Sequence, residues 1–124
     1  MIHVPQKKIA ENAKKGLDLR KEYGRGGTRI GLIRANQLVR RENLSFRTIK
    51  RMKSFFARHK NNLDLPQAKD KNHPGYPSNA LIAHYLWGGD EGERFAKKIV
   101  DKLKEIDQIR SYHLKNMDFV NLLS

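Results

Sequence analysis

The residues best suited to contact an anionic ligand are basic side chains spaced so that one helix would place them along a single side. They are Arg47, Arg51 and Arg58, with Ser54 in the same row and Lys50 beside it. Such a row of one charge sign is typical of a surface that follows a series of phosphates, whereas an ordinary solvated helix face mixes both signs. We interpret the row as a phosphate-contacting surface; the alternative is a solvated face beside a buried stripe.

The net positive charge of the chain is confined to its first half. Residues 1–60 hold 17 Lys and Arg against 4 Asp and Glu, a net charge of +13 that equals the net charge of all 124 residues. A positive field concentrated in this way attracts a polyanion, and nucleic acid is the commonest candidate. The basic residues predicted to contact nucleic acid are Arg25, Arg29, Arg40, Arg41, Arg47, Lys50, Arg51 and Arg58.

A glycine-rich loop, Arg25 to Arg29, is a second candidate for anion contact. Its two glycines would let backbone N–H groups approach a phosphate, and arginines flank them. The loop lacks the Lys-Ser/Thr ending of a P-loop. The alternative is a helix end followed by a turn.

The composition argues against several other kinds of site. The chain has no Cys, so it forms neither a disulfide nor a thiolate metal site, and its five His show no metal-ligand spacing. No nucleophile–His–acid arrangement is legible, so we expect no catalytic residues, no metal and no cofactor. We also expect no secretory signal and no membrane partner, because no apolar run approaches the roughly 18 residues that a membrane span needs.

The apolar periodicity is helical almost throughout, so we predict an all-α fold: a compact bundle of five to six short helices with a long polar loop near 60–77. The expected helices cover residues 6–23, 28–39, 45–59, 78–87 and 90–109, followed by a last segment at 114–123. We predict a helical domain at 1–111, with a basic half (1–60) and a neutral half (78–111), and a C-terminal helical extension or docking tail at 112–124.

Local signals predict where several of these helices begin. Thr28, Ser45 and Ser78 are expected N-caps, and Asp90 with Glu93 is expected to form a capping box. Trp87, before two glycines, is expected to be buried at a tight corner between helices. The predicted core consists of Ile9, Leu17, Ile33, Leu38, Phe46, Ile49, Met52, Phe56, Leu81, Tyr85, Trp87, Phe95, Ile99 and Leu103.

The helix at 28–39 and the Ser45-capped basic helix together have the outline of a helix-turn-helix. The connection at 40–44 is longer than the usual turn of three or four residues. We therefore expect contact with the phosphate backbone rather than sequence reading.

Four motifs resemble a small helical domain that recurs in tailed-phage and prophage proteins. They are the run from Thr48 to His59 (TIKRMKSFFARH), the run from Leu86 to Gly92 (LWGGDEG), the turn from Gly24 to Thr28 and the helix segment from Gly31 to Ala35. Members are found alone or attached to phage structural and head-assembly proteins. The resemblance implies a phage protein in the cytoplasm of an infected bacterial host or in the virion, and it assigns no catalytic or binding residues.

The resemblance covers roughly residues 5–100 and weakens after Ile99. Phe95 also stands where the family more usually has Trp. The C-terminal extension therefore looks particular to this chain, and it is a candidate for homo-oligomerisation.

Two hypotheses about function use the same charge. The first is a phage-encoded nucleic-acid-binding protein that contacts the phosphate backbone with little sequence specificity, with DNA favoured over RNA. The second is a virion structural or head-assembly protein whose basic half docks on an acidic protein surface or on packaged DNA. An inhibitor of a host nucleic-acid enzyme is a third, less favoured class.

Overall fold

The computed structural model describes the backbone of residues 2–123 and the side chains of residues 2–117. The described chain is helical, with no strand, and the prediction of an all-α bundle is confirmed. The elements are α1 (Lys7–Tyr23), α2 (Arg29–Val39), α3 (Phe46–His59), the 3-10 helix η1 (Lys60–Asp64), α4 (Pro66–Lys69), α5 (Asn79–Leu86) and α6 (Gly89–Leu123).

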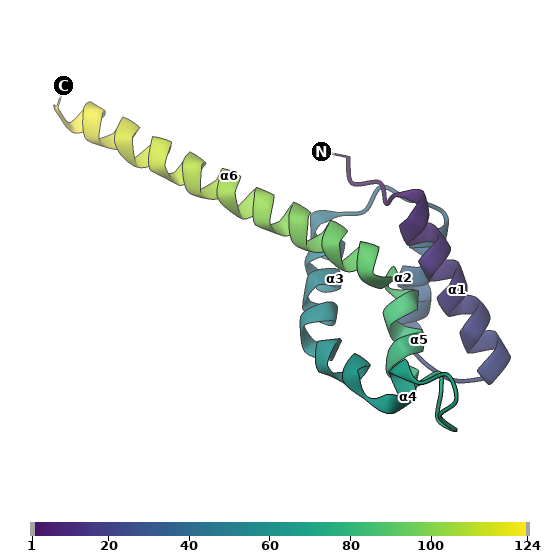
Figure 1. Cartoon of the computed structure of the whole chain (residues 1–124). Coiled ribbons are helices and arrows are strands. Elements are labelled where there is room, and N and C mark those ends of the chain that lie inside the picture. The colour runs from purple at the N-terminus through teal and green to yellow at the C-terminus, as the bar shows by residue number, and fades with distance from the viewer. Residues whose placement is uncertain (1, 124) are drawn as a thin grey trace.

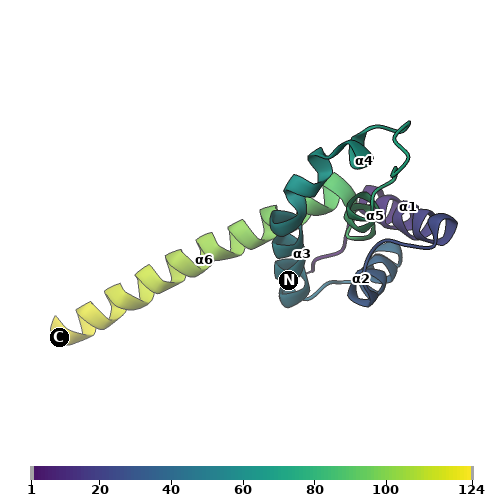
Figure 2. The ribbon, with the colours of Figure 1, turned by 90° about the horizontal axis from the view of Figure 1, so that it is seen from below.

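The helices form two groups that share the core. α1 packs on α2 and α5, while α3 packs on the first part of α6, and α6 also contacts α1 and α5. Figures 1 and 2 show α6 leaving the bundle and projecting well beyond the other helices. α2 and α3 thus belong to different groups, although they follow each other in the chain.

Three helices begin at the predicted hydroxyl caps. The hydroxyl oxygen of Thr28 accepts a hydrogen bond from the N–H of Gly31 at 3.2 Å, and the hydroxyl of Ser45 accepts one from the N–H of Thr48 at 3.1 Å. The hydroxyl of Ser78 accepts one from the N–H of Leu81 at 3.0 Å. Each bond satisfies an N–H that has no partner inside its helix. The caps therefore fix where α2, α3 and α5 start.

The close approach of α1 to α5 depends on Gly16. A Cβ atom at Gly16 would lie 2.5 Å from the backbone nitrogen of Leu86. Only a residue without a side chain lets the two backbones pack at this separation. The contact places α5, and with it Trp87, at the centre of the bundle.

Most of the predicted core is buried or half-buried, with two exceptions. Ile9, Leu38, Ile49, Met52, Phe56 and Trp87 are buried, and Leu17, Leu81, Tyr85, Phe95, Ile99 and Leu103 are half-buried. Ile33 and Phe46 are exposed, so their assignment to the core was wrong. Ile33 points away from the side of α2 that faces α1 and α5, and Phe46 is the first residue of α3, at the edge of the bundle.

The polar connection near 60–77 contains two short helices, η1 and α4. Its return to α5 is held by a hydrogen bond from the N–H of Ser78 to the carbonyl of Gln67, at 2.9 Å. Ala68 of α4 is buried. The connection is therefore packed against the bundle near the start of α5.

The start of α6 differs from the expected capping box. Asp90 Oδ1 lies 2.9 Å from Nε2 of His84, and Glu91 Oε2 accepts from the amide of Asn12 at 2.7 Å. α6 begins one residue earlier, at Gly89, so neither Asp90 nor Glu93 acts as the predicted cap. Asp90 and Glu91 instead tie α6 to α5 and α1.

α6 continues through residue 112 without a break and reaches Leu123. The segment predicted as an extension or tail at 112–124 is thus helical as far as 123, and the side chains after residue 117 lie outside the described residues. Within the described residues, none of the helices combines the length and apolar character that crossing a membrane demands.

Candidate nucleic-acid interface

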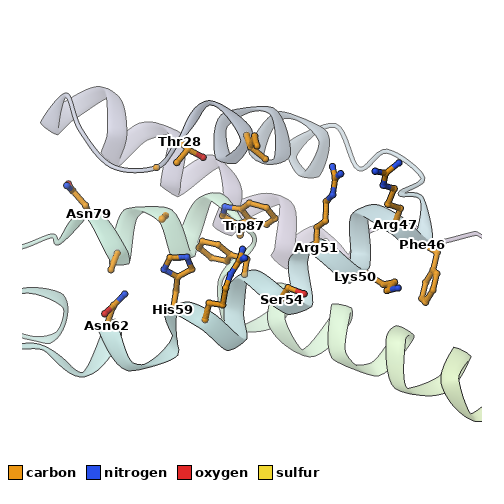
Figure 3. Close-up of a pocket in the computed structure, with 16 residues that line it drawn as sticks. Thr28, Phe46, Arg47, Lys50, Arg51, Ser54, His59, Asn62, Asn79 and Trp87 are labelled. Atoms are coloured by element: carbon orange, nitrogen blue, oxygen red, sulfur yellow. The ribbon is translucent and has the colours of Figure 1, made fainter.

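An open groove of about 1070 Å³ runs along α3. The facing side is formed by the loop and first turn of α2, at Gly27, Thr28 and Ile30, and by the first half of α5, at Asn79, Ala80 and Ala83. Figure 3 shows the side chains that line it. The groove separates the two helix groups described above.

Aromatic rings form the floor of the groove. The rings of Phe55 and Trp87 stack with centroids 4.5 Å apart and planes 7° from parallel, and the His59 ring lies 4.5 Å from Phe55 on its other side. Phe55 and Trp87 are buried apart from the surface that they present to the groove. An apolar floor lowers the local dielectric response, which strengthens electrostatic interactions above it.

α3 brings four of the predicted contact residues together: Arg47, Lys50, Arg51 and Arg58 all line the groove. Figure 3 shows Arg47 and Arg51 extending in the same direction, toward α2. Among the described residues that line the groove there is no Asp or Glu. The groove therefore presents positive charge without its own counter-ion.

A fifth cation, Arg34, lies behind the wall of the groove. Its side chain is only 4% exposed, with its guanidinium 5.3 Å from the centre of the Trp87 ring. One terminal nitrogen donates to the side chain of Gln37 at 2.6 Å, whereas the buried Nε has no hydrogen-bond acceptor among the described residues. Burial, and then the charge of Arg51, lower the pKa of Arg34.

Sequence reasoning did not select Arg34 as a site residue. Its burial depends on the ring of Trp87, which is 53 positions away in the chain, and no local pattern predicts that contact. The same holds for Phe55 and His59, which the sequence pattern did not mark as site residues.

Two of the predicted contact residues lie at the ends of the glycine-rich loop. Arg25 donates to the side chain of Asn79 at 2.8 Å, and its guanidinium lies over the ring of Tyr23. Arg29 is exposed at the first residue of α2. These two residues flank the part of the loop that lines the groove, at Gly27 and Thr28.

The remaining two, Arg40 and Arg41, lie after α2 and do not line the groove. Arg40 forms an ion pair with Glu42 at 2.9 Å. Arg41, with a φ of 50°, donates from Nε to the carbonyl of Pro5 at 2.8 Å and so holds the N-terminal segment against this turn. Both side chains already have local partners.

The glycines of the loop are explained by packing. Gly26 and Gly27 have positive φ values of 98° and 76°, and a Cβ at Gly26 would lie 2.7 Å from the side chain of Ile82. The carbonyl of Gly26 also accepts from Arg20 at 3.1 Å. These contacts support the interpretation of the loop as a tight structural turn.

Comparisons with known proteins give no family, relative or fold neighbour: no family model, no curated protein and no solved structure matches this chain. Among the residues that the structure describes, no group of His, Asp and Glu is arranged to hold a metal ion. The function is therefore inferred from the groove.

Proposed function

We propose that this protein binds nucleic acid through the phosphate backbone, with little sequence specificity, in the groove along α3. The observation that carries the proposal is the row of Arg47, Lys50, Arg51 and Arg58 in a groove whose lining has no acidic residue. Arginine and lysine are the residues that supply most phosphate contacts.

The environment of Arg34 supports an anionic ligand. A buried guanidinium without a carboxylate partner raises the free energy of the unliganded protein, and the neighbouring Arg51 adds repulsion. An anion bound beside Arg51 would offset both effects. The aromatic floor excludes water from one side of such an anion and so strengthens the attraction.

The packing of α2 and α3 favours backbone contact over base reading. In a helix-turn-helix the first helix supports the recognition helix, which enters the major groove. Here α2 packs on α1 and α5, while α3 packs on α6. The cations of α3 face the groove between the two groups, where they suit a chain of phosphates more than a set of base edges.

Charge reversal on α3 tests the proposal. The double variant Arg47→Glu, Arg51→Glu should weaken binding to duplex and single-stranded DNA of unrelated sequences to a similar extent, as measured by fluorescence anisotropy. The matched control is Lys97→Glu, Lys104→Glu, which changes the net charge equally on the exposed side of α6. Equal losses in both variants would mean that net charge alone attracts the DNA.

The second candidate function is docking on an acidic protein surface, as part of a virion or of head assembly. The observation that favours it is the three groove arginines, Arg47, Arg51 and Arg58, because a guanidinium pairs with a carboxylate as well as with a phosphate. Co-purification with virions, together with displacement of DNA by polyglutamate at similar charge concentration, would support this function. Under both functions the proposed location is the cytoplasm of an infected bacterial host, or the virion.

A further inference from the structure

The projecting half of α6 carries an apolar side that nothing in the described chain covers. Ile106, Ile109, Leu114 and Met117 are 42%, 53%, 56% and 61% exposed. Ile106, Leu114 and Met117 continue the side on which Ile99 packs against the core, whereas Ile109 lies about 80° around the helix from Ile99. Figures 1 and 2 show this half of the helix standing clear of the bundle.

An isolated helix of this kind is not expected to persist in water. Most helical stability in proteins comes from packing of the apolar side rather than from helix propensity. Single exposed apolar residues are ordinary, but several aligned along one side of a projecting helix mark a surface that another molecule covers. The molecule that covers this side of α6 must match its apolar residues and the charges beside them.

We infer that α6 pairs with α6 of a second copy of this chain, antiparallel, about a two-fold axis at Arg110. The residues along the stripe, Leu103, Ile106, Arg110, Leu114 and Met117, are spaced by three, four, four and three positions, the same in either direction. An antiparallel pair centred on Arg110 therefore places Ile106 against Leu114 of the second copy and Leu103 against Met117. Both contacts are apolar, and each occurs twice.

The charges beside the stripe are complementary in this arrangement. Asp107 lies beside the stripe, one turn before Arg110. Arg110 buries its aliphatic stem at the centre and extends its guanidinium toward Asp107 of the second copy, three positions along the helix. Flanking pairs of opposite sign are the usual determinants of orientation in paired helices.

Long-range electrostatics also favour the antiparallel arrangement. Residues 90–124 hold seven basic and seven acidic residues, so two α6 helices do not repel each other as a whole. The +13 of each copy lies in residues 1–60, within the bundle. An antiparallel pair holds the two basic bundles at opposite ends, whereas a parallel pair would bring them side by side.

Analytical ultracentrifugation of the full chain over a range of concentrations tests the pairing. The protein should sediment with twice the monomer mass of 14.4 kDa. Ile106→Glu with Leu114→Glu should return it to a monomer whose bundle stays folded and whose projecting half of α6 loses helix content. The control Gln108→Glu with Ser111→Glu adds the same charge on the opposite side of α6 and should remain dimeric. A monomer at all concentrations, or equal loss of the dimer in both variants, would overturn the inference, as would a monomer that instead binds lipid vesicles through this stripe.

Single cysteines test the orientation, because the chain has none of its own. Arg110→Cys should form an intermolecular disulfide under mild oxidation, since the two copies of residue 110 meet at the axis. Met117→Cys should not, because an antiparallel pair holds the two copies of residue 117 about 21 Å apart along the helix, beyond disulfide reach. Cross-linking of Met117→Cys at the rate of Arg110→Cys would refute the antiparallel pair.

Discussion

Neutralising Arg47 and Arg51 should change the salt dependence of DNA binding by an amount that the groove predicts. Four cations line the groove, so four phosphate contacts would give a slope of log K against log salt of about −3.6 on duplex DNA. Replacing Arg47 and Arg51 by Gln removes two contacts and should reduce the slope to about −1.8. Between 50 and 200 mM salt, the affinity should then fall about 150-fold for the parent and only about 12-fold for the variant.

The assay is fluorescence anisotropy with a labelled duplex, in four or five salt concentrations at constant pH. Lys97→Gln with Lys104→Gln is the matched control, because both lysines are exposed on α6 and outside the groove. The control should retain the parent slope, with only a small uniform loss of affinity. A slope that is unchanged in the groove variant, or that falls equally in both variants, would refute the assignment of these arginines to phosphate contacts.

Three further changes test the fold that holds the groove. Trp87→Ala should lower the free energy of unfolding by about 3–5 kcal/mol in a urea titration, because it removes the largest ring of the core; stability like that of the parent would contradict a buried structural role. Gly16→Ala should cost about 1–3 kcal/mol, since its Cβ would meet the backbone of Leu86, and a melting temperature unchanged from the parent would argue against this close approach. A hydrogen bond from its own backbone, and then one from the amide of Asn12, lower the pKa of Glu91 from the ordinary value of 4.5. Glu91 therefore stabilises the fold above pH 4.5, and this stabilisation is lost as the pH falls through the lower pKa of the folded state. Glu91→Gln should therefore show a weaker loss of stability on acidification than the parent, and identical acid transitions would count against the proposed role of Glu91.

Features set by residues close together in the chain were predictable. The caps at Thr28, Ser45 and Ser78 follow from hydrogen bonds that span three residues, and the buried stripe of α3 follows from helical spacing. The absence of Gly and Pro after Gly92 also indicates that α6 has no internal break. The predicted boundary between a domain ending at residue 111 and an extension at 112–124 therefore does not interrupt the helix. Local chemistry decided these elements because no distant partner competes with it.

Features that depend on distant residues were not predictable. His84 of α5 takes Asp90 away from the expected capping box, and Asn12 of α1 binds the neighbouring Glu91, so both contacts come from other helices. The helical spacing of Arg47, Lys50, Arg51 and Arg58 predicted a shared side of α3, but it could not supply the facing wall. That wall exists because Gly16 brings α5 close to α1, which leaves the space between α2 and α3 open.

All four groove cations project from one straight helix, and this limits how much nucleic acid a single chain can touch. Arg47 and Arg58 are eleven residues apart, a rise of about 16 Å. A duplex carries one phosphate per 3.4 Å of axis on each strand, so the row spans at most about five base pairs. Coverage of a long DNA therefore requires many copies, and binding at saturation is set by how closely neighbouring proteins can crowd along the duplex rather than by the length of any one contact.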